Sequence, residues 1–166
     1  MTVSSTVARL FVENFASVQA IARRLRRSQD ELRPLMPLDP ARMEALSDIE
    51  RTHLDAFIKR FENLQDILDS QVLRGLLLLE DVDLSGKTPR DVSNLLEKWG
   101  IIESAAGWRE LRDLRNTLAH EYPREPGIQV ERLNRAYGSV DALLGVLERV
   151  RTHAMTKGLA DLSAHS

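Results

Sequence analysis

The sequence predicts an all-α fold, an up-down bundle of about five helices. Apolar residues recur at steps of three and four along almost the whole chain, which is the spacing of one helix face. No stretch alternates apolar and polar residues between hairpin turns, so strands are not expected. A length of 166 residues fits one domain. We expect a single domain over 1–166, with its core over about 5–155 and a frayed tail over about 156–166.

The first expected helix spans about residues 5–33. It is followed by the proline-rich run "RPLMPLDP", which ends it because proline interrupts helical hydrogen bonding. Its apolar face repeats through Val7, Leu10, Phe11, Phe15, Val18, Ile21, Ala22 and Leu25.

A second, long helix is expected to begin at Pro40, with Asp39 as its N-terminal cap, and to reach about Leu79. Gly75 is the expected position of a bend, because glycine is destabilising inside a helix. The apolar face of this helix runs through Met43, Leu46, Ile49, Leu54, Phe57, Phe61, Leu64, Leu68 and Val72.

Three shorter sequence signals place the remaining helices. After the turn "DLSGK", Thr88 and Pro89 provide the cap and first-turn proline of a third helix, which ends near Trp99 and Gly100. A fourth helix follows and ends in a polar motif. Two prolines and a glycine then interrupt the chain, and a near-heptad apolar repeat predicts a fifth helix over about 130–155.

The composition narrows the chemistry and the compartment. The chain has no cysteine, which excludes disulfides, thiolate nucleophiles and cysteine-bound zinc. Neither a secretory leader nor an apolar stretch of membrane-spanning length is evident, so we expect a cytoplasmic protein without a membrane partner. The net charge of -2 argues against general polyanion binding. The only dense basic cluster, within 22–33, is expected to be a solvated helix face, and its contact with a substrate stays open.

The end of the fourth helix, "RDLRNTLAHEYP" at 112–123, places several polar side chains beside an apolar face. On a helical wheel, Arg112, Asn116 and His120 form a polar row at four-residue steps. Arg115 and Tyr122 fall along the border of the apolar face. That face consists of Trp108, Leu111, Leu114 and Leu118.

These residue types are suited to a phosphodiester. An arginine so near a core requires an anion or several acceptors, and its planar guanidinium matches the oxygens of a phosphate. His120 is of the type best suited to proton transfer near neutral pH. A purely structural alternative stays open: Arg115 pairs with Asp113, Glu121 or a carboxylate on another helix, while Asn116 and His120 serve the helix end.

The run "RNTLAHEY" at 115–122 is similar to the R-N-x-x-x-H-x-Y signature of HEPN-domain proteins. In particular, it resembles HepT, the toxin of HEPN/MNT toxin–antitoxin modules. The all-helical pattern and "AFIKRFENLQDIL" in the second helix add to the resemblance, which covers about residues 5–155. The chain departs from it in "PREPG", which follows the tyrosine directly.

The resemblance implies a metal-independent endoribonuclease toxin that acts as a homodimer and needs no cofactor. Arg115 is then expected to hold the scissile phosphate of the RNA, His120 to move the proton, and Asn116 to orient one of them or the substrate. Arg112, on the same polar row, is expected to contact the substrate. Tyr122 is the expected site of AMPylation by a minimal nucleotidyltransferase antitoxin. The resemblance also leaves a second function open, a non-catalytic HEPN partner subunit of a nucleotidyltransferase.

Overall fold

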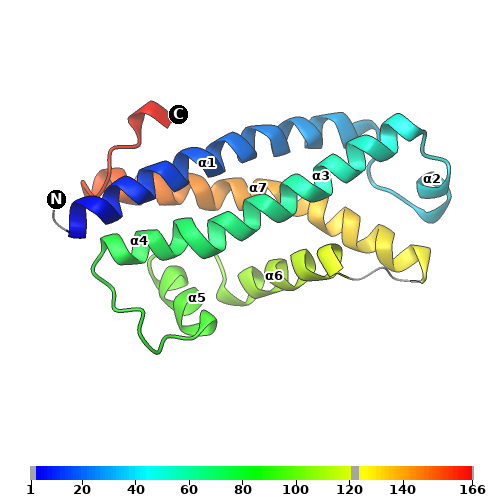
Figure 1. Cartoon of the computed structure of the whole chain (residues 1–166). Coiled ribbons are helices and arrows are strands. Elements are labelled where there is room, and N and C mark those ends of the chain that lie inside the picture. Colours follow the sequence, from blue (N-terminus) through cyan, green and yellow to red (C-terminus); the bar gives the residue numbers. More distant parts are fainter. Residues whose placement is uncertain (1–2, 121–123, 166) are drawn as a thin grey trace.

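The computed structural model describes residues 3–120 and 124–165 and confirms the all-α class. Successive long helices run in opposite directions across Figure 1, and the described residues contain no strand. None of the helices in this part of the chain combines the length and apolar character needed to cross a bilayer. The bundle is formed by α1 (Val3–Leu32), α3 (Asp48–Ile67), α4 (Arg74–Leu79), α5 (Pro89–Lys98), α6 (Ala105–His120) and α7 (Pro126–Thr156).

The predicted second helix is divided in the structure, which corrects its expected start. Pro40–Glu44 form a short helix, α2, capped by Asp39, whose carboxylate accepts from the backbone nitrogen of Arg42 at 2.7 Å. A new helix, α3, then starts at Asp48. Its cap is Ser47, which forms a reciprocal capping box with Glu50 and thereby satisfies free N–H groups at the helix start. Ile49, expected in the core, is consequently 70% exposed.

The rod that begins with α3 continues to Leu79 through a π-helical segment, η2 (Leu68–Leu73). Gly75, the expected position of a bend, lies within α4, and the π-helical segment ends two residues before it. Gly75 serves packing instead, because a Cβ atom there would lie 3.1 Å from Cδ2 of Phe11 on α1. Glycine thus permits α1 and α4 to approach closely.

The core confirms most of the apolar pattern. From α1 it receives Phe11, Phe15, Val18, Ala22, Leu25 and Leu32, and from the α3 rod Leu54, Phe57, Phe61, Leu64, Leu68 and Val72. Leu10 is an exception, since its side chain is more than half exposed. The tail differs from the expected frayed segment, because Leu162 is fully buried in the same core.

The start and end of α5 agree with the sequence. Thr88 and Asp91 form a capping box, with the Thr88 hydroxyl 3.2 Å from the Asp91 nitrogen. The helix ends at Lys98, with Trp99 as its cap, and Gly100 follows at a φ of 71°. This left-handed conformation favours glycine and turns the chain toward α6.

A polar cluster joins the ends of α4, α5 and α7. Glu80, the cap residue of α4, contacts Lys157 Nζ at 2.6 Å and the His153 ring nitrogen at 2.5 Å. The imidazole of His153 stacks on Trp99 with the ring centres 5.5 Å apart. The hydrogen bond and charge of Lys157 lower the pKa of the Glu80 carboxyl below 4.5, and His153 acts in the same direction, although burial opposes them.

This cluster predicts an acid-sensitive contribution to stability. Because folding lowers the pKa of Glu80, its stabilising effect is fully present above pH 4.5 and is lost as the pH falls through the lower, folded-state pKa. We expect Glu80→Gln to lower the free energy of unfolding at pH 7 and to narrow that deficit progressively below pH 4.5, as measured by urea denaturation. Glu44→Gln, at an exposed position, is the control. A constant deficit across this pH range would contradict the assignment.

Candidate functional site

The described part of the predicted polar motif, 112–120, lies on α6, which is packed along the rod of α3 and η2 (Figure 1). The start of α6 is held by Ser104, whose hydroxyl accepts from the Gly107 nitrogen at 3.0 Å. Trp108, Leu114 and Leu118 are buried, with exposures of 3%, 4% and 8%. Leu111 is partly buried against them. The apolar face predicted for this helix is therefore confirmed, and it fixes the direction in which the flanking arginines point.

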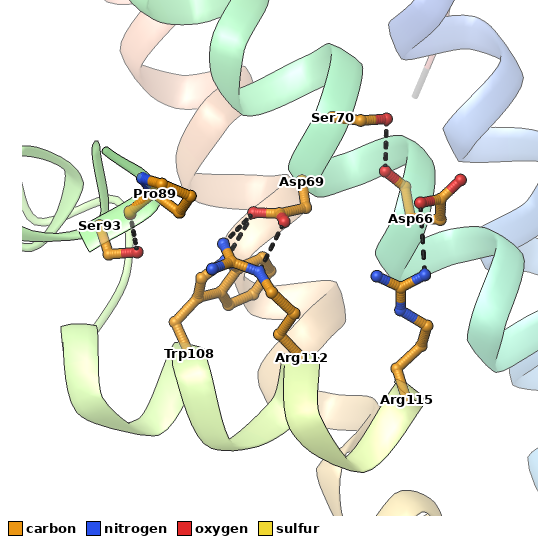
Figure 2. A network of polar contacts seen from close by, with 8 residues as sticks. All are labelled: Asp66, Asp69, Ser70, Pro89, Ser93, Trp108, Arg112 and Arg115. Carbon is orange, nitrogen blue, oxygen red and sulfur yellow. Dashed lines mark hydrogen bonds and ion pairs between the residues drawn. The ribbon is translucent and has the colours of Figure 1, made fainter. Parts of the chain in front are cut away.

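Arg112 is anchored to the rod by Asp69. Its Nε and Nη2 donate to the two oxygens of the Asp69 carboxylate, each at 2.9 Å. The same carboxylate accepts a hydrogen bond from Trp108 Nε1 at 2.9 Å, as Figure 2 shows. Only about a fifth of the Arg112 and Asp69 side chains is exposed, at 21% and 23%. This paired, bidentate geometry is typical of a structural contact between two helices.

Asp69 belongs to the π-helical segment of the rod. A π turn inserts an extra residue into a helix and changes the direction in which nearby side chains point. Ser70 accompanies this turn by donating its hydroxyl to the carbonyl oxygen of Asp66 at 2.7 Å. One turn earlier lies the buried side-chain amide of Gln65. In the orientation that satisfies its hydrogen bonds, its nitrogen donates to the Leu111 carbonyl oxygen at 3.1 Å, and its oxygen accepts from the Arg112 backbone nitrogen at 3.1 Å. The rod therefore meets α6 through several polar contacts in one short stretch.

Arg115 is held much more loosely than Arg112. Its Nη1 lies 3.5 Å from Oδ1 of Asp66, at the limit of a hydrogen bond, and the Asp66 side chain is 60% exposed. Its Nε is buried and finds no hydrogen-bond acceptor among the described residues. Figure 2 shows its guanidinium beside Asp66, separate from the Asp69 cluster. An arginine with a weak partner and an unused donor can accept an anion at little cost.

Of the other motif residues, the structure describes the side chain of Asn116 but not those of His120 and Tyr122. Asn116 is exposed and makes no hydrogen bond to Arg115, so of its three expected partners, Arg115, His120 and the substrate, only Arg115 can be checked among the described side chains, and that contact is absent. His120 ends α6, but its side chain lies outside the described part of the structure, as does all of Tyr122. The expected roles of His120 and Tyr122 therefore stay predictions.

The sequence left open the alternative that Arg115 forms an ion pair within the protein, and the structure shows such a pair. Arg115 pairs with a carboxylate on another helix, Asp66, and not with Asp113. Sequence reasoning did not single out Asp66 or Asp69, although two carboxylates three residues apart beside Leu64 and Leu68 were a usable signal. Each pairs with an arginine more than forty residues away, a separation of 49 for Arg115 and 43 for Arg112. Two carboxylates thus balance two guanidinium groups.

Comparisons with known proteins add no family assignment: no protein-family model matches the chain, and no curated protein matches it. Over residues 3–120 and 124–165, no group of three or more histidine, aspartate or glutamate side chains could hold a metal ion. The candidate site therefore rests on the geometry of α6 and of the rod beside it.

Proposed function

We propose that this chain is an endoribonuclease that cleaves RNA without a metal ion, with Arg115 and His120 as its catalytic residues. The observation that carries the proposal is the contrast between the two arginines of α6. Asp69 binds Arg112 through two nitrogens at 2.9 Å, whereas Arg115 has one contact at 3.5 Å and a buried Nε–H without a described acceptor. The planar donor set of Arg115 matches the oxygens of a phosphodiester.

The chemistry we propose is an internal transfer of the RNA phosphate. The ribose 2'-oxygen attacks the neighbouring phosphorus, its proton passes to a general base, and the bond to the 5'-oxygen breaks as that oxygen receives a proton. The products are a 2',3'-cyclic phosphate and a free 5'-hydroxyl. His120 serves as the base or the acid, and Arg115 stabilises the charge of the pentacoordinate transition state. Because DNA lacks the 2'-hydroxyl, it is not cleaved.

The proposal includes a homodimer in which two copies of the motif face a shared cleft. A single chain provides one Arg115 and one His120, and a two-fold dimer is the commonest arrangement of identical subunits. Such a dimer supplies one histidine as the base and a second as the acid. A monomer at micromolar concentration in light scattering would contradict this part of the proposal.

We also propose that the enzyme is a HepT-like toxin controlled by a nucleotidyltransferase antitoxin. The site of AMPylation is Tyr122, two residues after His120 and seven after Arg115. The added phosphate brings negative charge and bulk close in sequence to His120, so that it repels RNA.

The deciding experiment is an RNA cleavage assay without added metal, performed with protein whose intact mass shows an unmodified Tyr122. We expect the wild type to leave 2',3'-cyclic phosphate ends and His120→Ala to be roughly 100- to 10,000-fold slower, which is the usual contribution of general acid–base catalysis. An RNA with 2'-methoxy groups is the substrate control, because it lacks the nucleophile. Inactivity of the unmodified wild type on several RNA pools would favour the non-catalytic partner subunit.

A second expected result concerns Asp66. An RNA phosphate that binds Arg115 must displace this exposed carboxylate, so Asp66→Asn removes both a competitor and a repulsive charge. We expect KM for RNA to fall about three- to tenfold, which corresponds to roughly 1 kcal/mol for an exposed ion pair. Asp113→Asn makes the same charge change at an exposed position of α6 that forms no described ion pair. A higher KM in Asp66→Asn alone would show that this carboxylate orients Arg115.

A further inference from the structure

Three arginines on α1 share a shallow hollow on the surface of the bundle. Arg23, Arg24 and Arg27 line it together with Ala20, and its volume is about 290 Å³. All three are exposed. None of their guanidinium groups forms a hydrogen bond or an ion pair with the described part of the chain. The hollow is therefore open to solvent and lined by three unneutralised cations.

Two nearby arginines, by contrast, form ion pairs with carboxylates. Arg26 on α1 contacts Asp141 on α7, and Arg33, directly after α1, contacts Asp30 at 2.6 Å. Between Glu13 and Asp30, by contrast, the sequence of α1 contains no acidic residue. Asp30 and Glu31 follow Arg27 by one turn, but Asp30 pairs with Arg33, and no ion pair joins either carboxylate to the three arginines in the described part of the chain.

The arrangement of the three arginines on α1 is electrostatically unfavourable when nothing is bound. Arg23 and Arg27 are four residues apart, and Arg24 and Arg27 are three apart, so each pair lies on adjacent turns of one helix face. Like charges at these spacings repel one another. An anion bound between them relieves the repulsion, and a chain of phosphates can serve all three guanidinium groups in turn.

The position of the hollow relates it to Arg115. Arg60 on α3 donates to the Arg24 carbonyl oxygen at 3.2 Å and to the Ser28 hydroxyl, which places this part of α1 against α3. Six residues further along the same helix, Asp66 contacts Arg115 on α6. That interval is about 9 Å along the axis. Figure 1 shows α3 running between α1 and α6.

The surface of α3 between these points is suited to a polyanion. Asn63, a neutral amide, is exposed there, and Lys59, directly before Arg60, is an exposed cation. Lys59 forms no ion pair with a described residue. The same stretch carries one carboxylate, Glu62, which is half-buried, and it ends at Asp66, which already pairs with Arg115. Two helix-to-helix spacings of about 8–10 Å separate α1 from α6, a span that a few nucleotides can cover.

We propose that Arg23, Arg24 and Arg27, with Lys59, bind the phosphate backbone of an RNA strand that continues across α3 to Arg115. The inference rests on the proposed function for its end point, the cleavage site. It adds a substrate-binding surface on a different helix, and it supplies the positive charge that the balanced cluster of α6 lacks. Contacts to the backbone alone provide affinity without sequence preference.

The test uses binding, so that it does not depend on cleavage. The probe is a fluorescent 2'-methoxy RNA of about 16 nucleotides, the upper range of single-strand sites, and its affinity is measured by anisotropy at several salt concentrations. The variant is Arg23→Gln/Arg24→Gln/Arg27→Gln. The matched control removes three exposed cations at and before α5, as Lys87→Gln/Arg90→Gln/Lys98→Gln. Circular dichroism checks that both retain the helical fold.

We expect the α1 variant to bind at least about tenfold more weakly and its salt slope to fall by about 2, since each lost phosphate contact in single strands contributes about 0.7. The control should remain within about twofold of the wild type. Equal affinity of the α1 variant and the wild type would overturn the inference. Arginine-dependent binding to phosphatidylserine vesicles, without binding to the RNA probe, would also overturn it. Arginine-dependent RNA binding by a wild type that cleaves no RNA would support the surface and reject the proposed nuclease.

Discussion

Arg115→Gln is expected to slow RNA cleavage by roughly 100- to 1,000-fold while changing the free energy of unfolding by less than about 1 kcal/mol. The large effect on rate follows from the loss of a cation beside the phosphate in the transition state. The small effect on stability follows from the contacts of the Arg115 side chain. Its single ion pair is long, at 3.5 Å, and its partner Asp66 is mostly exposed. Its buried Nε–H is unpaired among the described residues, so its removal breaks no hydrogen bond there.

Arg112→Gln is the matched variant, and we expect the opposite result. The substitution removes both hydrogen bonds to Asp69 and leaves that carboxylate partly buried without its counter-charge. Stability should therefore fall by about 1.5–3 kcal/mol, whereas the cleavage rate of the folded fraction should fall much less. Cleavage rates at saturating RNA and urea denaturation of the same preparations measure the two effects. A loss of rate in Arg112→Gln equal to that of Arg115→Gln, at unchanged stability, would show that Arg112 touches the substrate.

The two arginines of α6 show which features of the site the sequence could predict and which it could not. A helical wheel correctly placed both arginines beside the apolar face of Trp108, Leu114 and Leu118. It could not distinguish them, because their partners come from a helix more than forty residues earlier in the chain. Long-range pairing depends on how two helices pack, and local periodicity does not specify that.

The helices themselves were largely predictable because local signals coincide with their ends. The break before Asp48 was not predicted, although it has a local signal in Ser47 and Glu50. Apolar spacing through Met43, Leu46 and Ile49 obscured it, since a stripe can continue through a break in the helix. The π-helical segment has no such signal. Within it, Asp69 accepts a hydrogen bond from Trp108 on α6, a contact that forms only when the two helices pack together.

Asp69 is where these contacts converge, and Asp69→Ala is expected to be the most destabilising polar substitution near the site. It removes three hydrogen bonds at 2.9 Å, two from Arg112 and one from Trp108 Nε1. It also leaves a guanidinium that is only 21% exposed without its counter-charge. Hydrogen bonds to charged groups and broken, partly buried ion pairs together suggest a loss of about 2–4 kcal/mol. Urea denaturation, with an unchanged dependence on urea, measures this loss.

Asp66→Ala is the control for Asp69→Ala, because Asp66 lies three residues earlier and pairs with the other arginine. Its carboxylate is 60% exposed, so we expect its removal to cost less than about 1 kcal/mol. Asp69→Ala/Arg112→Leu should recover part of the loss, since the double variant leaves no unpaired charge between the helices. Equal stability of the two single variants would instead mean that Trp108, Leu114 and Leu118 anchor α6 without help from the ion pair. The cleavage rate should then be insensitive to Asp69, because Arg115 would keep its position on the rod.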